Sequence, residues 1–282
     1  MLKLFSFCFA ILFFLLSPPT FSQIREVVIT IDDLPFVGTT NNKEGNLKRE
    51  SDRFMKIMQA LVDNKVPAIG FVVAGTIEHG QWQLLQEFQN AGFMLGNHTN
   101  THLCLNNSNV QKYMDDIAKA DKTLTPLITG PKYFRYPYLA EGQGTTRERA
   151  HSFLAENQYI IAPVTIDSKD FEFNAQLLAI NWRNREQNVT SFKKRYLDFI
   201  WKQTLRAEKL HPDKPQILLI HANLLNSYCL GDIIKIYKDN GYTFVNITDV
   251  LPPDIYLVRP SKLPSILPTP GQPAITKVDV KA

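Results

Sequence analysis

The sequence predicts an α/β fold, a (β/α) barrel with seven strand–helix units in a single domain. Seven apolar or β-branched runs alternate with seven segments of helical periodicity between residues 24 and 250. Runs such as Ile160–Ile166 and Ile217–Ile220 lack polar alternation, which is typical of parallel strands that are buried on both faces. A doubly wound open sheet has the same order of elements and is the alternative fold.

The predicted elements follow one another as short strands and longer amphipathic helices. Predicted strands are Glu26–Ile31, Val66–Ala74, Phe93–Gly96, Tyr133–Tyr136, Tyr159–Ile166, Gln216–Ile220 and Tyr242–Ile247. Predicted helices are Leu47–Asn64, Thr76–Asn90, Val110–Leu127, Thr145–Asn157, Asn174–Arg185, Ser191–Lys209 and Gly231–Asn240. In the first helix, Phe54, Ile57 and Leu61 share one face. This alternation predicts a parallel sheet with right-handed crossovers.

Both ends of the chain differ in composition from the predicted barrel. An apolar run at Leu4–Leu16 is followed by prolines and small residues, the pattern of a secretory signal peptide over residues 1–22. The run is shorter than the ~20 residues of a transmembrane helix, so we expect a cleaved leader, with an uncleaved anchor as the alternative. Residues 23–250 are the predicted domain, and the proline-rich residues 251–282 are a tail. We expect an exported protein, periplasmic or secreted, that meets the membrane only through the leader.

The composition excludes several classes of protein. Lys and Arg number 31 against 27 Asp and Glu, so the chain has no basic footprint and no nucleic-acid partner is expected. Apolar residues make up 44%, which is enough for an ordinary core and argues against disorder. Cys104 and Cys229 are too few for a disulfide scaffold. They either form one disulfide or are two unpaired thiols.

Ionisable side chains follow five of the predicted strands, at the end where the chemistry of a parallel barrel takes place. These residues are Asp32 and Asp33 after the first strand, His98 and His102 after the third, Arg135 and Tyr138 after the fourth, Asp167 and Asp170 after the fifth, and His221 after the sixth. Packing does not explain them, because a buried charge is costly unless it is paired or bound to a metal.

A metal site is the first chemical reading of these strand ends. His98 and His102 are spaced so that both imidazoles lie on one side of a helical turn. Two histidines and one carboxylate form a recurrent ligand set for zinc, and the same set suits Fe(II), Co(II) or Ni(II). The pair Asp32 and Asp33 can supply one ligand and one base, since both side chains reach the rim at a strand end. Polar turns and helix caps are the structural alternatives for both pairs.

Five motifs in this chain resemble those of the polysaccharide deacetylases, the NodB homology domain of carbohydrate esterase family 4. They are T-I-D-D at 30–33, H-T-N-T-H at 98–102, R-Y-P-Y at 135–138, D-S-K-D-F at 167–171 and L-I-H at 219–221. The motifs occur in the order of the family, and each lies at a predicted strand end. The resemblance implies a distorted (β/α)7 barrel, a glycan substrate and a divalent metal ion.

The resemblance also implies roles for individual residues. Asp33, His98 and His102 would hold the metal ion, for which we expect Zn²⁺, while Co²⁺ or Ni²⁺ fit the same ligands. Asp32 would be the base that takes a proton from metal-bound water. His221 would be the acid that protonates the leaving amine.

Further roles belong to residues around this set. Arg135 would keep Asp32 ionised through a charged hydrogen bond, and Asp170 would pair with Arg135 or His221. The backbone N–H of Tyr138 would stabilise the oxyanion, and Leu219 would line the pocket for the acetyl methyl group. Substrate contacts are expected from Tyr136, Phe171, Leu219 and Trp182.

The resemblance also implies the activity. We expect a metal-dependent hydrolase that removes N-acetyl groups from N-acetylhexosamine residues of a cell-wall or chitin-like glycan. Phe171 stands where the family usually has Trp, and the polar stretch Phe36–Lys48 is expected to be a loop that narrows the cleft. The alternatives are a hydrolase of another C–N bond, such as a formamide or cyclic imide, and an exported glycan-binding protein with a degenerate site.

Overall fold

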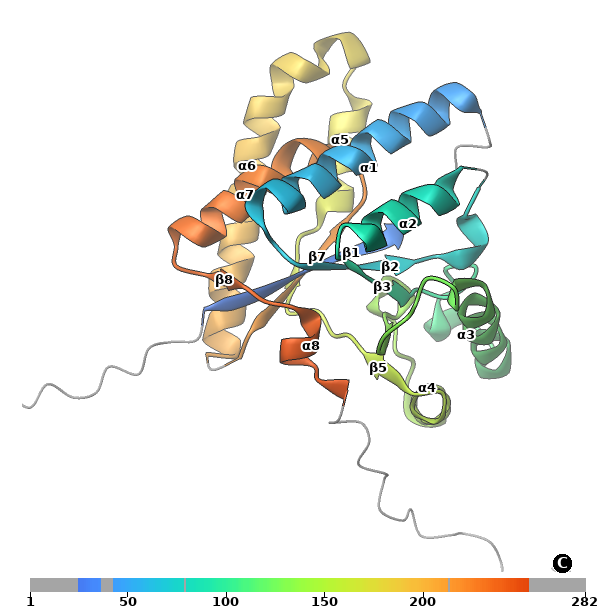
Figure 1. The fold of residues 1–282 in the computed structure, drawn as a ribbon. Helices are drawn as coiled ribbons and strands as arrows, with labels where there is room; N and C mark the ends of the chain where they lie inside the picture. Colours follow the sequence, from blue (N-terminus) through green and yellow to red (C-terminus); the bar gives the residue numbers. More distant parts are fainter. Residues whose placement is uncertain (1–24, 37–42, 79, 213, 254–282) are drawn as a thin grey trace, which may run out of the picture. The chain divides into compact units, whose positions relative to one another are not determined.

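The computed structural model describes residues 25–36, 43–78, 80–212 and 214–253, which divide into two compact units. The first unit contains residues 25–32, 43–68 and 164–245. The second unit contains residues 33–36, 69–163 and 246–253. Each unit has parallel strands connected by helices (Figure 1), so the α/β class is observed in both.

The sheet of the first unit is parallel and has four strands. Their order is β6 (Ile166–Asp167), β7 (Gln216–His221), β1 (Glu26–Leu34) and β8 (Thr243–Phe244). Its helices are α1 (Glu44–Asn64), α5 (Asp170–Ala179), α6 (Trp182–Leu210) and α7 (Leu224–Asp239), of which α1 and α7 lie side by side (Figure 1). Val27 and Ile29 are fully buried on β1, as expected for a strand covered on both faces.

The sheet of the second unit is parallel as well. Its strands, in spatial order, are β2 (Ala68–Val72), β3 (Met94–Asn97), β4 (Lys132–Phe134) and β5 (Tyr159–Ile161). Its helices are α2 (Gln81–Asn90), α3 (Val110–Leu124), α4 (Gly144–Glu156) and α8 (Ile247–Val250), with 3₁₀ turns η1 (Ala74–Thr76), η2 (Leu105–Asn107) and η3 (Pro137–Leu139).

Local chemistry explains why these elements begin and pack where they do. The Asn109 side chain caps α3 by accepting hydrogen bonds from two backbone N–H groups of its first turn. Tyr113 and Ile117, one turn apart on α3, are fully buried in the core of this unit. Gly96 on β3 is required, since a Cβ there would lie 2.7 Å from the Phe71 ring and 2.9 Å from the Tyr133 carbonyl oxygen.

Several predicted elements have different limits in the structure, and three of them show the physical reason. The run predicted as one strand, Tyr159–Ile166, is two strands, because Pro163 lies between them and cannot donate to a sheet. The predicted helix Asn174–Arg185 is wrong in the same way, since α5 ends at Ala179 and α6 begins at Trp182. The strand predicted at Tyr242–Ile247 is confined to Thr243–Phe244, and α8 begins at Ile247 with an Asn246 capping box.

The predicted loop and the predicted terminal segments are only partly described. Residues 44–48 belong to α1, so the prediction of a loop over Phe36–Lys48 is wrong for that part, and residues 37–42 lie outside the described residues. The predicted signal peptide at 1–22 and most of the predicted tail, 254–282, also lie outside them. Within the described ranges, no helix has the length and apolar character needed to cross a membrane.

Candidate active site

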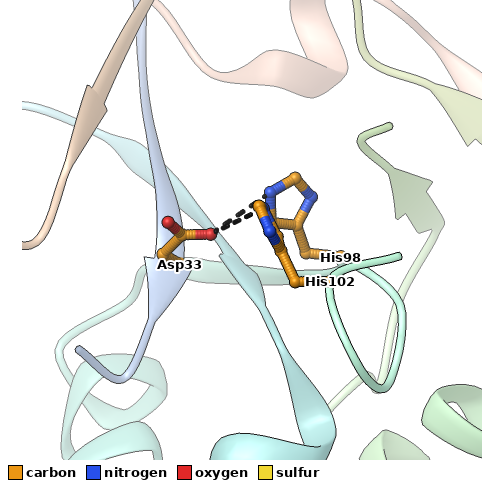
Figure 2. A group of neighbouring side chains, drawn as sticks. All are labelled: Asp33, His98 and His102. Atoms are coloured by element: carbon orange, nitrogen blue, oxygen red, sulfur yellow. Dashed lines mark ion pairs between the residues drawn. The ribbon is translucent and has the colours of Figure 1, made fainter. Parts of the chain in front are cut away.

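Three predicted metal ligands come together in the second unit. Asp33, His98 and His102 each offer one ligand atom, and these atoms lie within 4.8 Å of one another. Oδ1 of Asp33 is 3.1 Å from Nε2 of His102 and 3.5 Å from Nε2 of His98. Figure 2 shows the carboxylate on β1 facing both imidazoles, which come from the segment after β3. Residues 65 positions apart thus meet at one point.

A backbone contact fixes the direction of one imidazole. His98 is 2% exposed, and its Nδ1 lies 2.8 Å from the carbonyl oxygen of Arg135. A carbonyl only accepts hydrogen bonds, so Nδ1 carries the hydrogen, and in the neutral imidazole the lone pair is then on Nε2. Nε2 is the atom that faces Asp33. Histidines that bind a metal commonly have this arrangement, in which one nitrogen is the ligand and the other donates to a carbonyl.

The segment between the two histidines is held by residues that sequence reasoning missed. The Asp116 carboxylate accepts hydrogen bonds from the backbone N–H of Asn100 at 3.0 Å and of Thr101 at 2.9 Å. The Asn97 side chain accepts another from the N–H of Thr99 at 2.7 Å. These bonds shape the turn that brings His102 back towards His98. Asp116 lies within the predicted helix Val110–Leu127, where only its polarity marks it in the sequence.

Left-handed backbone conformations cluster at this site. The φ angles are 62° at Asp33, 66° at Thr99, 55° at His102 and 58° at Tyr138. Non-glycine residues rarely adopt such angles, and each costs on the order of 1–3 kcal/mol unless the surroundings hold it in place. Strain of this kind concentrates at functional sites, and residue type alone does not reveal it.

The donor set fits a divalent transition metal. Two imidazole nitrogens and one carboxylate oxygen are ligands that Zn²⁺, Co²⁺ and Ni²⁺ accept. The carbonyl behind His98 supplies the outer hydrogen bond that such ligands usually have. Asp33, His98 and His102 therefore have the chemistry and the proximity that a metal site requires.

The guanidinium of Arg135 is buried and held in a fixed position. Arg135 is 1% exposed, and its Nε donates to the Ala162 carbonyl at 2.7 Å. Its guanidinium also lies 4.7 Å from the centre of the Phe71 ring. Stacking and directed donors suit a residue that must present a fixed charge. The hydrogen bond predicted between Arg135 and Asp32 stays a prediction.

The two tyrosines of the third motif have opposite environments. Tyr136 is 2% exposed, with its ring stacked on Tyr113 at 6.1 Å and facing His151 at 6.0 Å, and burial raises its pKa. The predicted contact between Tyr136 and the substrate is therefore wrong, because the ring belongs to the core. Tyr138 is 68% exposed, and its ring lies 4.5 Å from that of His102.

A second polar cluster lies in the first unit, at the ends of β1 and β7. Asp32 and His221 are register partners on these adjacent parallel strands. Asp170 is fully buried, and one of its oxygens lies 2.7 Å from Nδ1 of His221. Of the two partners predicted for Asp170, this contact supports His221. The carboxylate accepts the hydrogen on Nδ1, so Nε2 of the imidazole is left for other chemistry.

A shell of amides and a phenol surrounds the Asp170 carboxylate. Its second oxygen accepts from the His221 backbone N–H at 2.7 Å, Asn223 Nδ2 at 2.8 Å and Asn226 Nδ2 at 2.5 Å. The Asn226 side chain in turn accepts from the Tyr196 hydroxyl at 2.9 Å. Asn226 was not predicted, because the last long helix was expected to begin at 231, whereas α7 begins at Leu224. Asn223, the N-cap of α7, was the available signal.

The remaining predicted substrate contacts are distributed unevenly. Phe171 is 50% exposed, and its ring centre lies 6.4 Å from that of His221. Leu219 is 5% exposed on β7, two residues before His221. Trp182 is 69% exposed at the start of α6, after the ten residues of α5. Its predicted contact with the substrate stays a prediction.

The two cysteines of the predicted domain are free thiols. Cys104 is half-buried, while Cys229 is buried. Burial raises the pKa of the Cys229 thiol to about 12. Of the two alternatives from the sequence, unpaired thiols are the one observed.

Comparisons with known proteins agree with the motifs and the fold. Residues 22–154 match the family profile described as polysaccharide deacetylase. A peptidoglycan-N-acetylglucosamine deacetylase of Bacillus cereus is 26% identical over 148 residues, which are 52% of this chain and 46% of that protein. The chain thus spans less than half the length of this curated relative.

Solved structures show the same fold at low sequence identity. A chitin deacetylase from the fungal pathogen Colletotrichum lindemuthianum has a TM-score of 0.58 and 20% identity, covering 82% of this chain and 89% of that one. A CE4 family pseudoenzyme from Bacillus anthracis has a TM-score of 0.57 and 17% identity, covering 80% and 65%. These likenesses confirm the predicted α/β fold of the (β/α)7 barrel type.

Proposed function

We propose that this chain, whose residues 22–154 match the polysaccharide deacetylase profile, is a member of that family and a metal-dependent hydrolase that removes N-acetyl groups from N-acetylhexosamine residues of a glycan. The match to this profile supports glycan deacetylation as the class of reaction. The observation that carries the metal-dependent mechanism is the convergence of Asp33, His98 and His102 within 4.8 Å. The other residues are assigned by their contacts around this point.

Asp33, His98 and His102 would hold the metal ion, with Zn²⁺ as the first candidate and Co²⁺ or Ni²⁺ as alternatives. A divalent ion bound by such ligands acidifies water and polarises an amide carbonyl. The hydrogen bond from Nδ1 of His98 to the Arg135 carbonyl makes Nε2 a better ligand and fixes its direction.

Asp32 is the proposed base. It is 2% exposed, and it directly precedes the ligand Asp33, so that their Cα atoms are about 3.8 Å apart. A carboxylate at this position can take a proton from the attacking water while its neighbour binds the metal. The predicted hydrogen bond from the guanidinium of Arg135 would orient the Asp32 carboxylate.

His221 is the proposed acid. Asp170 holds the hydrogen on Nδ1 of His221 at 2.7 Å, which stabilises the imidazolium and leaves the Nε2 proton for transfer. An amide nitrogen is a poor leaving group unless it is protonated, so this transfer to the departing amine is needed to complete the cleavage.

Three residues would receive the acyl group and the sugar. The backbone N–H of Tyr138 is the proposed donor to the oxyanion, and its left-handed conformation sets the direction of that N–H. Leu219 supplies an apolar wall for the acetyl methyl group. Phe171, half exposed beside the His221 ring, supplies a surface against which a sugar can lie.

The substrate is proposed to be an extracellular polymer. The Bacillus cereus relative is named for peptidoglycan and the fungal structure for chitin. A leader at residues 1–22 would deliver the chain to the compartment where such polymers occur. We therefore propose a periplasmic or secreted enzyme that acts on N-acetylglucosamine in one of these materials.

Acetate release tests this function. Purified protein is incubated with acetylated chito-oligosaccharides and with peptidoglycan, with and without a chelator. We expect acetate from at least one glycan, its loss on chelation and its return when Zn²⁺ is added back. Glycan binding without acetate release, in the presence of metal, would instead indicate a binding protein that shares the fold, as the CE4 pseudoenzyme does.

A further inference from the structure

A groove of about 360 Å³ lies between α1 and α7, within the first unit. Successive turns of α1 form one wall, and the first turns of α7 form the other. Its polar and aromatic lining consists of Lys48, Arg49, Asp52, Arg53, Lys56, Ser227 and Tyr228. The α1 residues recur at helical spacing, so they share one face of that helix.

The groove has an excess of positive charge. Four cationic side chains and one carboxylate line it. The carboxylate of Glu50, also on α1, forms an ion pair with the Arg53 guanidinium at 2.5 Å and lies 3.5 Å from that of Arg49. Lys48 and Lys56, in contrast, form no ion pair with any residue that the structure describes. Two ammonium groups are thus left to attract an anion.

An exposed aromatic ring completes the groove. Tyr228 is 40% exposed, and the Lys56 ammonium lies 5.6 Å from the centre of its ring. The flat face of a tyrosine contacts the C–H face of a sugar, while a neighbouring lysine can bind a substituent on that sugar. This combination favours a charged sugar over an isolated inorganic anion.

The groove begins close to the proposed acid along the chain. Leu224, which lines the groove, is the first residue of α7, three residues after His221. Tyr228 follows Leu224 by about 6 Å along the helix axis. The N-cap of α7, Asn223, donates to the same Asp170 carboxylate that holds His221. A glycan whose amide nitrogen meets His221 could therefore extend over this groove.

We infer that the groove between α1 and α7 binds an anionic substituent, a carboxylate or a phosphate, on a sugar near the one that is deacetylated. Tyr228 supports the sugar ring, and Lys48 and Lys56 attract the charge. This inference rests on the proposed function and narrows its substrate class to acidic glycans. A neutral chitin chain gains nothing from the two ammonium groups, whereas the peptide carboxylates of peptidoglycan do.

The test compares acidic and neutral substrates of equal length. Acetate release is measured on a chito-oligosaccharide, on a peptidoglycan fragment with its peptide carboxylates, and on an oligosaccharide phosphate monoester. The variant is Lys48→Gln/Lys56→Gln. The matched control is Lys194→Gln/Lys235→Gln, which removes two exposed charges that already pair with aspartates at 2.7 Å outside the groove.

We expect the groove variant to lower the ratio of kcat/KM for acidic over neutral substrate about fivefold, mainly through KM, because exposed charge pairs are individually weak. Added salt should lower the same ratio in the wild-type protein. Whichever acidic substrate is preferred identifies the anion. An unchanged ratio in the groove variant, or an equal drop in the control, would overturn the inference while leaving the deacetylase proposal intact.

Tyr228→Ala tests the ring separately. It should lower kcat/KM for all three substrates alike, since stacking does not depend on charge, and an unaffected variant would remove Tyr228 from the inference. If no glycan releases acetate, the proposed function fails instead, and affinity is measured by calorimetry with the same substrates. Tighter binding of acidic glycans, lost in Lys48→Gln/Lys56→Gln, then supports the groove, and equal binding overturns it.

Discussion

Replacing Asp170 by Asn separates the proposed acid from the rest of the active site. Asp170 is fully buried, and its carboxylate accepts four hydrogen bonds, two of them from His221. The other two come from the side chains of Asn223 and Asn226. Asparagine has the same size, but its amide nitrogen donates hydrogens and accepts none.

The size of the effect follows from which way the new amide faces. In one orientation the new amide nitrogen would replace the oxygen that accepts three hydrogen bonds. All three donors would then lose their acceptor, which costs about 1–3 kcal/mol for each. If the amide nitrogen instead faces Nδ1 of His221, only one contact changes, so this orientation is favoured. Nδ1 must then accept a hydrogen bond, and the doubly protonated imidazole is lost. We expect kcat to fall by about 100-fold or more, the contribution of a general acid.

The assay uses two leaving groups. Acetate release from a chito-oligosaccharide, whose amine needs a proton, should fall strongly in Asp170→Asn. Release from an aryl acetate ester, whose phenolate leaves without a proton, should fall much less. Asp167→Asn is the matched control, since Asp167 pairs with Lys169 at 2.8 Å and is partly exposed. Equal losses on both substrates, or full activity of Asp170→Asn with its metal in place, would refute this role for His221.

The remaining predictions concern the base, a buried thiol and a glycine. Asp32→Asn should abolish acetate release while metal content stays near that of the wild-type protein, and loss of the metal would mean that Asp32 is the ligand. Cys229 should resist alkylation in the native protein while Cys104 reacts. Burial raises the pKa of the Cys229 thiol to about 12, against an ordinary value of 9.0. The folded protein keeps this proton after the unfolded chain has lost it, so the free energy of unfolding should fall as the pH rises from 9 towards 12. In urea unfolding, a Cys229→Ala variant should show a smaller fall over this range. Gly96→Ala should lower the free energy of unfolding by about 1–3 kcal/mol through overpacking, and an unchanged urea midpoint would contradict the close contact with Tyr133.

The polar residues at strand ends were predictable from the sequence, because each directly follows an apolar run that is expected to be buried. Asp33, His98 and His102 are polar residues directly after apolar runs, and in a parallel sheet such ends lie together. The pairing of Asp170 with His221 was also among the predicted alternatives. These inferences need only strand order and residue type, both of which are local in the sequence.

Side-chain directions were not predictable in the same way. Tyr136 stands within a functional motif but points into the core, while Tyr138, two residues later, is exposed. The left-handed backbone at Tyr138 changes the local alternation, and no residue type signals that conformation. The break between α5 and α6 was missed as well, so Asn174–Arg185 was predicted as one helix.

Networks assembled from distant segments were likewise hidden. The shell of Asn226 and Tyr196 around Asp170 joins residues from α5, α6 and α7. Each of these residues is unremarkable where it stands in the chain. Their role appears only once tertiary packing brings them to one buried carboxylate.

The proposed mechanism requires that Asp33, His98 and His102 together hold one divalent cation. Metal content measured after dialysis against Zn²⁺ tests it directly, with each ligand replaced by Ala in turn and with the exposed His211 replaced as the control. We expect one bound ion per chain in the wild-type protein and in His211→Ala, and its loss in every ligand variant. A wild-type protein that binds no ion, or ligand variants that bind it as well as the wild type, would contradict the claim.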